Sequence, residues 1–571
     1  MENLAMATSE STAAAESPWI DGMTIGQVLE QTAEKRGDAD CLVFPAIDFR
    51  MSFREFRDEV RRVARGLLAM GIGHGDHVAI WATNVPQWVV LQFATAEIGA
   101  VLVTVNPAYR PFELKYVLEQ SDAVALFLVR SFKSSNYFEM LAEVCPELAE
   151  GEPGKISSEQ FPKLRAVVGI DDVPPAGALS WDQVIQRGQE VDEAELDIVA
   201  AALDAGQKIN IQYTSGTTGF PKAATLSHRN LLLNAYYIGE CQRMTEQDRI
   251  CIPVPFYHCF GCVLGTLCAA VYGTAMIVPA ESFNPAVTLD AIEKERATVI
   301  YGVPTMFIAQ LEDELLESRD LTSLRTGIMA GSPCPIEIMR KVIDKMGASE
   351  VTIAYGQTEA SPVVTQTRTD DPLELRVETV GRTIPGVEAK IVNPETGEEL
   401  GDNEQGEFCS RGHVVMIGYY KDEEATRRAI DADGWLHSGD LAVRLPNGYY
   451  KITGRIKDMV IRGGENIYPR EIEEFLFTHD AIEQAAVVGV PDKKYGEELC
   501  AWIRLKSGFA GNDGLADELR TFCRDNLARF KVPRYIRFVD AFPQTVTGKI
   551  QKFKIREAMI DELGLEEAET A

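Results

Sequence analysis

Short apolar segments alternate with helical segments in the first third of the chain, and this alternation limits the fold more than any other feature. The apolar segments are residues 77–81, 101–105, 123–129 and 166–169, with helical stretches between them. Such an alternation is typical of α/β proteins, in which helices cover a central sheet. We therefore expect an α/β fold for this part of the chain.

One of these helices is marked by its own residues. Residues 52–70 carry apolar side chains at steps of three and four, and Ser52 and Glu55 have the spacing of a capping box. Three glycines follow the helix and precede the segment 77–81. They do not match a dinucleotide-binding fingerprint, because that motif follows a strand and opens a helix. We expect a turn here.

The length and composition describe a large globular protein. The chain has 571 residues, which correspond to about four domain-sized units. Hydrophobic residues make up 46% and charged residues 25%, as in ordinary globular proteins. The formal net charge is −30, and such a field repels the phosphate backbone of nucleic acids. We therefore expect no nucleic-acid partner, and any phosphate-bearing ligand needs a local group of basic residues.

The cysteines and the N-terminus favour a cytoplasmic protein. The cysteines number 11, which is sparse and odd, so a secreted disulfide framework is disfavoured. Residues 1–16 contain three Glu and neither Lys nor Arg, so they lack the basic region of a secretory signal.

A long uncharged stretch raises the question of whether the chain spans a membrane. Residues 251–280 carry no charged side chain, and residues 260–278 are long enough for a transmembrane helix. However, Pro253, Pro255 and Pro279 bracket this run, glycines interrupt it, and no basic cluster flanks it. We predict a buried core helix and strand, and no transmembrane span.

The sequence pattern changes at two further points. From about residue 381 short strands and turns indicate a small β-rich unit, and after residue 454 helices and strands alternate again. We expect a loose tail over residues 1–20, a large N-terminal domain over residues 21–454 and a small C-terminal domain over residues 455–571.

The segment YTSGTTGFPK at residues 213–222 is the strongest local motif. Small hydroxyl residues and glycines allow backbone N–H groups to approach a phosphate closely, and Lys222 adds a cation. The segment is not the P-loop of NTPases, because Gly219 is followed by Phe-Pro rather than by Lys and Ser or Thr. It therefore predicts phosphate binding by another architecture.

This segment resembles the signature of the adenylate-forming enzymes, which include acyl-CoA and aryl-CoA synthetases. Five further motifs follow in that superfamily's order: AGSP at 330–333, YGQTE at 355–359, GWLHSGD at 434–440, GRIKD at 454–458 and TGK at 547–549. The resemblance implies a large N-terminal AMP-binding domain of α/β subdomains with a small β-rich subdomain, followed by a small mobile α+β C-terminal domain.

The resemblance also implies a reaction in two steps. A carboxylate attacks the α-phosphate of ATP to give an acyl-adenylate and pyrophosphate, and a thiol then attacks the acyl carbon and releases AMP. The residues that it assigns to ATP are Thr214, Ser215, Gly216, Thr217, Thr218, Gly219, Lys222, Gly331, Ser332, Pro333, Tyr355, Gly356, Gln357, Thr358, Asp440 and Arg455.

Three residues are expected to be catalytic. Glu359 is expected to ligate Mg²⁺, since a hard cation prefers a carboxylate together with phosphate oxygens. Lys549 is implied to bridge the carboxylate and the α-phosphate, a task that suits a point cation on a flexible stem. His258 is expected to orient the carboxylate or to gate the acyl pocket.

The C-terminal part is expected to serve the thiol. Lys457 occupies the hinge position, and Gly463 and Gly464 would let a pantetheine arm pass close to the backbone. Residues 529–556 contain eight Lys or Arg and one acid, which is the basic group that CoA would need, although a solvated basic face has the same composition.

Cys259 and Cys262 form a C-x-x-C pair at the start of the uncharged stretch. The sequence offers no second pair at the spacing of a zinc site, so we expect neither metal nor redox chemistry here.

Taken together, the motifs predict a fatty acid–CoA ligase for medium to long chains, with ATP, Mg²⁺ and CoA. The uncharged stretch favours an apolar acyl chain. An aryl-acid ligase of the 4-coumarate type and a carrier-protein-loading adenylase remain alternatives, and a non-catalytic membrane-associated binding protein is the alternative from another class. A fatty substrate also leaves peripheral contact with the inner face of a membrane open, and the sequence does not reveal the oligomeric state.

Overall fold

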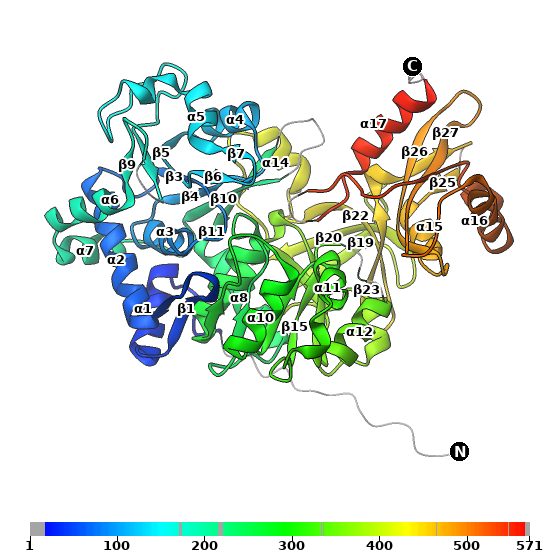
Figure 1. Ribbon diagram of the computed structural model, residues 1–571, viewed down its shortest axis with the longest axis horizontal. Helices are drawn as coiled ribbons and strands as arrows, with labels where there is room; N and C mark the ends of the chain where they lie inside the picture. The colour runs from blue at the N-terminus through cyan, green and yellow to red at the C-terminus, as the bar shows by residue number, and fades with distance from the viewer. Residues whose placement is uncertain are drawn as a thin grey trace, which may run out of the picture.

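The protein consists of a large body and a smaller C-terminal body (Figure 1). The structure is a computed structural model that describes residues 17–170, 174–214, 221–332, 334, 336–463, 465–545 and 548–565. In Figure 1 the blue to yellow part of the chain forms the large body, and the orange to red part forms the small body beside it. The α/β fold expected for the large domain and the α+β fold expected for the small C-terminal domain are both confirmed.

One sheet of the large body contains the four apolar segments from the first third of the chain. They form strands at its centre, and these strands run parallel to one another because helices connect them. The strand order is β21 (Gly418–Tyr419), β11 (Lys222–Ser227), β10 (Lys208–Thr214), β4 (Val101–Thr104), β3 (His77–Trp81), β5 (Ala123–Leu128), β8 (Ala166–Gly169) and β9 (Leu179–Ser180).

The helix predicted over residues 52–70 is α2 (Phe53–Ala69). Ser52 caps its N-terminus: the Ser52 hydroxyl accepts from the Glu55 N–H at 3.3 Å, and the Glu55 carboxylate accepts from the Ser52 N–H at 2.8 Å. This reciprocal pair satisfies two N–H groups that the helix itself cannot bond. The apolar face that the spacing predicted is buried.

A second sheet forms the other half of the large body. Its central strands are parallel, and β1 from near the N-terminus pairs with β13 from far along the chain. The order is β18 (Arg382–Thr383), β17 (Val363–Gln366), β16 (Glu350–Gly356), β15 (Thr326–Ala330), β14 (Val299–Gly302), β12 (Arg249–Cys251), β13 (Ala275–Ile277), β1 (Asp40–Phe44) and β2 (Phe49–Ser52).

The uncharged stretch 251–280 lies within this second half as buried core. It contains the end of β12, a π-helical segment (Phe260–Leu267), the short helix α9 (Cys268–Tyr272) and β13. Among the described residues, no helix is both long enough and apolar enough to cross a membrane. The prediction of a core helix and strand is therefore confirmed.

The β-rich unit expected after residue 381 is a separate antiparallel sheet. Its order is β19 (Val387–Val392), β20 (Gln405–Gly412), β22 (Leu436–Arg444) and β23 (Tyr450–Arg455). The chain leaves this sheet at Arg455 and begins the C-terminal sheet at β24 (Val460–Arg462). The change of sheet falls beside the boundary that the sequence predicts near residue 454.

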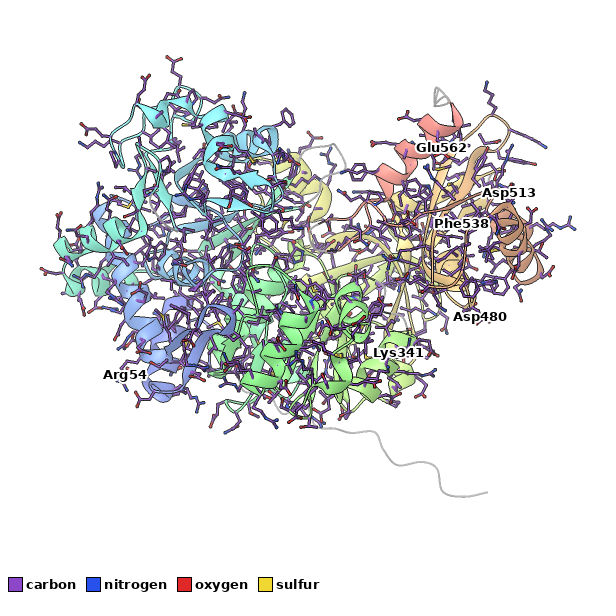
Figure 2. All side chains as sticks on the ribbon, viewed as in Figure 1. Arg54, Lys341, Asp480, Asp513, Phe538 and Glu562 are labelled. Carbon is purple, nitrogen blue, oxygen red and sulfur yellow. The ribbon has the colours of Figure 1, made fainter. Side chains whose placement is uncertain are left out.

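The C-terminal body has its own sheet and its own hydrophobic clusters. Its further strands are β25 (Glu465–Ile467), β26 (Ile482–Asp492), β27 (Gly496–Leu505) and β28 (Tyr535–Phe538), and its helices are α15 (Pro469–Leu476), α16 (Asp513–Asn526) and α17 (Lys552–Leu563). Figure 2 labels Asp513, Phe538 and Glu562 in this body. Glu562 of α17 forms an ion pair with Arg537 of β28 and so fixes the last helix to the sheet.

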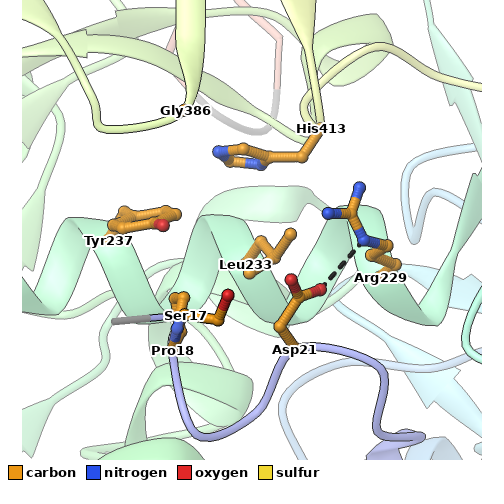
Figure 3. A pocket seen from close by; sticks show the side chains of 8 residues that line it. All are labelled: Ser17, Pro18, Asp21, Arg229, Leu233, Tyr237, Gly386 and His413. Atoms are coloured by element: carbon orange, nitrogen blue, oxygen red, sulfur yellow. Dashed lines mark hydrogen bonds and ion pairs between the residues drawn. The ribbon is translucent and has the colours of Figure 1, made fainter. Parts of the chain in front are cut away.

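A pocket of about 210 Å³ lies where the N-terminal segment meets helix α8 (His228–Cys241) (Figure 3). Arg229 on α8 forms an ion pair of 2.9 Å with Asp21, and the ring of Tyr237 lies 5.3 Å from that of His413. None of the sequence-predicted site residues lines this pocket. The pocket therefore lies between the N-terminal segment and α8, and it is separate from the sequence-predicted site.

Candidate active site

Glu359 follows a strand of one sheet and is held by side chains from the other sheet. It follows β16 in a short 3₁₀ turn (Thr358–Ala360), where its Oε1 atom accepts a hydrogen bond from the Thr214 hydroxyl at 3.1 Å. Thr214 is the last residue of β10, so the glycine-rich motif and the YGQTE motif meet at this carboxylate. The sequence predicted both residues, and the structure brings them together.

Tyr419 is a further partner of Glu359 that the sequence analysis missed. Its hydroxyl donates to the same Oε1 atom at 2.9 Å. The ammonium group of Lys222 lies 4.9 Å from the centre of the Tyr419 ring. Tyr419 reaches this position because β21 pairs with β11, the strand that Lys222 begins. No local pattern around residue 419 marks this pairing.

A second group joins three of the expected ATP-binding residues. Asp440 and Arg455 are opposite each other in the register of β22 and β23, and the Arg455 guanidinium is 2.8 Å from Asp440 Oδ1. The Tyr355 hydroxyl donates to Asp440 Oδ2 at 2.7 Å. Asp440 is buried, and its negative charge raises the pKa of Arg455. The group is a fixed carboxylate between a phenol and a cation.

The lysine loop of the C-terminal body reaches the large body. Gly548 has a φ of +78°, and a Cβ atom there would lie 2.8 Å from the Thr305 hydroxyl of helix α11 (Pro304–Leu311). The loop is closed by two hydrogen bonds between Thr545 and Lys549, of 3.0 and 2.8 Å. A side chain at position 548 would crowd Thr305 in a left-handed backbone conformation, so glycine suits this close approach of the loop to the large body.

Lys549 interacts electrostatically with several other residues of the site. Desolvation by the surrounding protein lowers its pKa, and the Arg455 cation lowers it further, whereas Asp440 and Glu359 act in the opposite direction. Burial lowers the pKa of His258 to about 3, and the Lys549 charge contributes. His258 is therefore a neutral imidazole, and its Nδ1 accepts from the Phe260 N–H at 3.1 Å.

Lys457, which the sequence predicts at the hinge, belongs to the same electrostatic group. It lies in a 3₁₀ turn (Ile456–Asp458) between β23 and β24. Desolvation lowers its pKa, as do the cations Arg455 and Lys222, while Glu359 raises it. Four positive charges therefore surround the carboxylates of Glu359 and Asp440. They belong to Lys222, Arg455, Lys457 and Lys549.

The remaining predicted residues fall into three groups. Gly331 and Ser332 follow β15, Gly356 ends β16, Gln357 follows it, and Thr358 is buried beside Glu359. Gly463 lies in the turn between β24 and β25, where its N–H donates to the Tyr495 carbonyl. Outside the described residues lie Ser215, Gly216, Thr217, Thr218, Gly219, Pro333 and Gly464.

The two cysteines of the C-x-x-C pair bond to one amide. The Cys259 thiol donates to Gln212 Oε1 at 3.0 Å, and Gln212 Nε2 donates to Cys262 Sγ at 3.1 Å. Burial raises the pKa of both thiols, that of Cys262 to about 12, so both carry their protons near neutral pH. Gln212 lies on β10, two residues before Thr214, so the two thiols are hydrogen-bonded to the strand that carries Thr214.

Most basic residues of the C-terminal stretch are paired with acids. The pairs are Lys531 with Glu471, Arg534 with Asp492, Arg537 with Glu562, Lys552 with Glu473 and Arg556 with Glu497. The sequence shows one acid among these eight cations because their partners come from other segments of the C-terminal body. The stretch is therefore less positive in the folded protein than its sequence indicates.

Two family models and several curated relatives match this chain. The family model described as "AMP-binding enzyme" matches residues 29–420, and the one described as "AMP-binding enzyme C-terminal domain" matches residues 471–549. The Bacillus subtilis protein named "Putative acyl-CoA synthetase YngI" is 53% identical over 95% of this chain and 98% of its own length. Human "Medium-chain acyl-CoA ligase ACSF2, mitochondrial" is 42% identical over 96% of this chain and 89% of its own.

Solved structures share the fold over nearly the whole chain. The anthranilate CoA ligase AuaEII in complex with anthranoyl-AMP has a TM-score of 0.82 at 26% identity and covers 94% of this chain and 97% of its own. ATP-bound MatB from Rhodopseudomonas palustris has a TM-score of 0.78 at 28% identity and covers 95% of this chain and 100% of its own. The chain belongs to the AMP-binding enzyme family.

Proposed function

We propose that this protein is an ATP-dependent fatty acid–CoA ligase that acts through an acyl-adenylate. The observation that carries the proposal is the meeting of Lys549, Glu359 and the Asp440–Arg455 pair at one site, although they come from distant segments. Each belongs to a different motif of the adenylate-forming superfamily. The relatives named as acyl-CoA synthetases support the same reaction class.

The first step joins two anions, and the four cations at the site suit it. A carboxylate oxygen of the acid attacks the α-phosphorus of ATP, and the bond to the pyrophosphate oxygen breaks. Lys549 would hold the acid carboxylate and the α-phosphate together, and Thr358 would donate to the same phosphate. Preorganised groups that stabilise the charge developing in the transition state lower the barrier for such a step. Asp440 and Arg455 would hold the ribose hydroxyls of the nucleotide.

The carboxylate of Glu359 fits Mg²⁺. Both of its hydrogen bonds to described residues reach Oε1, so Oε2 has no partner among them. Hard carboxylate and hydroxyl oxygens from Glu359 and Thr214 are the ligands that Mg²⁺ prefers. When bound with ATP, the cation would neutralise charge on the phosphate oxygens. Thr214 and Tyr419 would keep the Glu359 carboxylate oriented for it.

The second step transfers the acyl group to CoA. The CoA thiol attacks the acyl carbon, and AMP leaves. We assign residues 21–454 to the N-terminal domain and residues 455–571 to the C-terminal domain, with Lys457 at the hinge. The position of Lys549 near Glu359 suits the first step, whereas Gly463 bonds to Tyr495 within the C-terminal body. The second step would therefore need the C-terminal domain to turn about Lys457, which would bring Gly463 and Gly464 toward the pantetheine arm.

A medium-chain or long-chain acid is the substrate class that the chain supports best. The uncharged stretch begins at the site, because His258 interacts with the Lys549 charge and the buried apolar segment Phe260–Leu267 follows directly. Neither an acid nor an amide lies in residues 251–280 to pair with a substrate amino group. The name of the ACSF2 relatives, medium-chain acyl-CoA ligase, agrees with this class.

Pyrophosphate release from ATP and Mg²⁺ tests the proposal. It should be measured with straight-chain acids from acetate to oleate and with an aryl acid, each with and without CoA. We expect a maximum at a medium or long chain, with turnover only when CoA is present. A preference for the aryl acid would move the protein to the 4-coumarate type. No release with any acid would contradict the ligase assignment.

We also propose that the protein acts in the cytoplasm on small-molecule substrates. All 11 cysteines are unpaired, which a reducing compartment favours. Contact with a membrane surface would serve the delivery of a fatty acid. Sedimentation with lipid vesicles would test that contact.

Tyr419→Phe should slow adenylate formation about tenfold, because a hydrogen bond to a charged group contributes about 1.5–3 kcal/mol. The variant removes one of the two donors to Glu359 Oε1 and leaves Thr214 in place. We also expect it to need more Mg²⁺ for half-maximal rate. Tyr420→Phe is the matched control, since the Tyr420 hydroxyl bonds to Asp122. Equal effects of the two changes would contradict a specific role for Tyr419.

The lowered pKa of Lys549 predicts how adenylate formation depends on pH. The cation is the active form, and it loses its proton at a lower pH than an ordinary lysine, so the rate should fall as the pH rises through that value. Lys549→Arg should remove this alkaline fall, because a guanidinium stays charged. Pyrophosphate release against pH measures it. An identical alkaline fall in the arginine variant would show that another group causes it.

A further inference from the structure

Three side chains that can ligate a metal ion gather on the small β-sheet. Glu407 and Cys409 lie two residues apart on β20, and His437 lies on the neighbouring strand β22 (Figure 1). Cys409 and His437 are opposite each other in the antiparallel register. One carboxylate oxygen, the thiol sulfur and one ring nitrogen all lie within 4.8 Å of one another. Among the described residues this is the only such group of three.

The distance between the sulfur and the ring nitrogen matches a tetrahedral zinc site. Zinc bonds of about 2.3 Å to sulfur and about 2.0 Å to nitrogen place the two ligand atoms about 3.5 Å apart at a tetrahedral angle. Cys409 Sγ lies 3.5 Å from His437 Nδ1. Glu407 Oε2 lies 2.9 Å from the same nitrogen, so a bound ion needs that pair to open by about 0.5 Å.

Two neighbours lie against the ligands, one at ion-pair distance and one at hydrogen-bond distance. Asp431 Oδ2 lies 3.6 Å from Nε2 of His437, on the far side of the ring from Nδ1. A carboxylate in this position is the usual outer partner of a metal-bound histidine. Glu407 Oε1 accepts from the Gly439 N–H at 2.9 Å, which leaves Oε2 for the ion. The cluster therefore has inner ligands and outer support.

We propose that Glu407, Cys409 and His437 form a binding site for a borderline-soft divalent cation, of which Zn²⁺ is the best fit. Cys409 is buried, whereas the His437 side chain is 31% exposed, so solvent can deliver the ion and occupy its fourth position. The thiol distinguishes this site from Glu359, whose surroundings offer hard oxygen atoms that suit Mg²⁺. The inference does not depend on the proposed function.

The proposed metal site would lie directly beside Tyr355, Asp440 and Arg455, the residues expected to bind the nucleotide. Gly439, which bonds to Glu407, precedes Asp440 in β22. A cation on Oε2 of Glu407 would leave intact the hydrogen bond that Oε1 accepts from the Gly439 N–H. Binding is therefore compatible with the hydrogen bonds and the ion pair that Asp440 makes with Tyr355 and Arg455.

Titration with Co²⁺ tests the site without any measurement of activity. The full-length protein, kept reduced by a phosphine and free of nucleotide, should develop the intense near-ultraviolet band of a cobalt–thiolate bond, and Zn²⁺ should abolish it at one equivalent. Cys409→Ser should lose the band, and His437→Gln should bind Co²⁺ at least tenfold more weakly. Asp431→Asn should weaken binding about tenfold, as expected for an outer partner.

Two controls separate this site from other thiols and from the proposed magnesium site. Cys334→Ser removes the one half-buried cysteine, and Glu359→Gln removes the expected Mg²⁺ ligand; both should keep the band. Circular dichroism and thermal midpoints show whether each variant is folded. Absence of the band in the wild-type protein, or its persistence in folded Cys409→Ser protein, would overturn the proposal.

Discussion

Replacing Lys549 by alanine should abolish acyl-adenylate formation and leave the thiolysis of preformed acyl-adenylate largely intact. The loss should be at least ~10²–10³-fold, the range for removal of one preorganised charge-stabilising group. The reason is positional: Lys549 is the one cation of the site that the C-terminal loop supplies, and it acts together with Arg455 on the space near Glu359 and Asp440. Separate assays of pyrophosphate release and of AMP release from synthetic acyl-adenylate measure the two steps.

Lys552→Ala is the matched control for this change. Lys552 lies three residues further along the same stretch and pairs with Glu473 at 2.7 Å within the C-terminal body. Its loss should leave both half-reactions close to the wild-type rates. If Lys549→Ala slows both half-reactions equally, the lysine does not act specifically in the first step, and its assignment is wrong.

Local sequence patterns predicted the elements and much of the site's chemistry. The capping residues of α2 are two positions in one turn of chain, so spacing alone identifies them. The prolines and glycines of the uncharged stretch rule out one continuous helix, and the structure confirms the prediction that this stretch lies in the core. Thr214, Glu359, Asp440 and Arg455 are all residues that the motifs predict for the site, and the fold brings them together in two pairs.

What the sequence did not predict depends on pairing between distant segments. Tyr419 reaches Glu359 only because a two-residue strand joins the edge of a sheet. Cys409 and His437 become neighbours through the register of two strands whose intervening chain carries another helix. The basic C-terminal stretch looked available for CoA because its acidic partners lie elsewhere in the sequence. Contacts between residues that are far apart in the sequence follow from tertiary packing. A local repeat of apolar residues carries no information about them.

Glu359→Gln should slow adenylate formation by about 10²-fold and raise the Mg²⁺ concentration for half-maximal rate. Glutamine keeps the shape of the side chain and an oxygen that can accept from Thr214 and Tyr419, but it removes the charge. A hard divalent cation loses most of its attraction to the site when a carboxylate becomes an amide. Pyrophosphate release measured across a Mg²⁺ series at constant free ATP gives both quantities.

The Mg²⁺ series decides between two roles for this carboxylate. If Glu359 only positioned Thr214 and Tyr419, glutamine would lower the rate without changing the Mg²⁺ requirement, and the metal assignment would be wrong. Glu350→Gln provides the control, since Glu350 lies at the other end of β16 and pairs with Arg325 at 3.0 Å. It should leave the Mg²⁺ requirement unchanged. A raised requirement in Glu359→Gln alone, together with an intact thiolysis step, would place the metal and Lys549 in the same half-reaction.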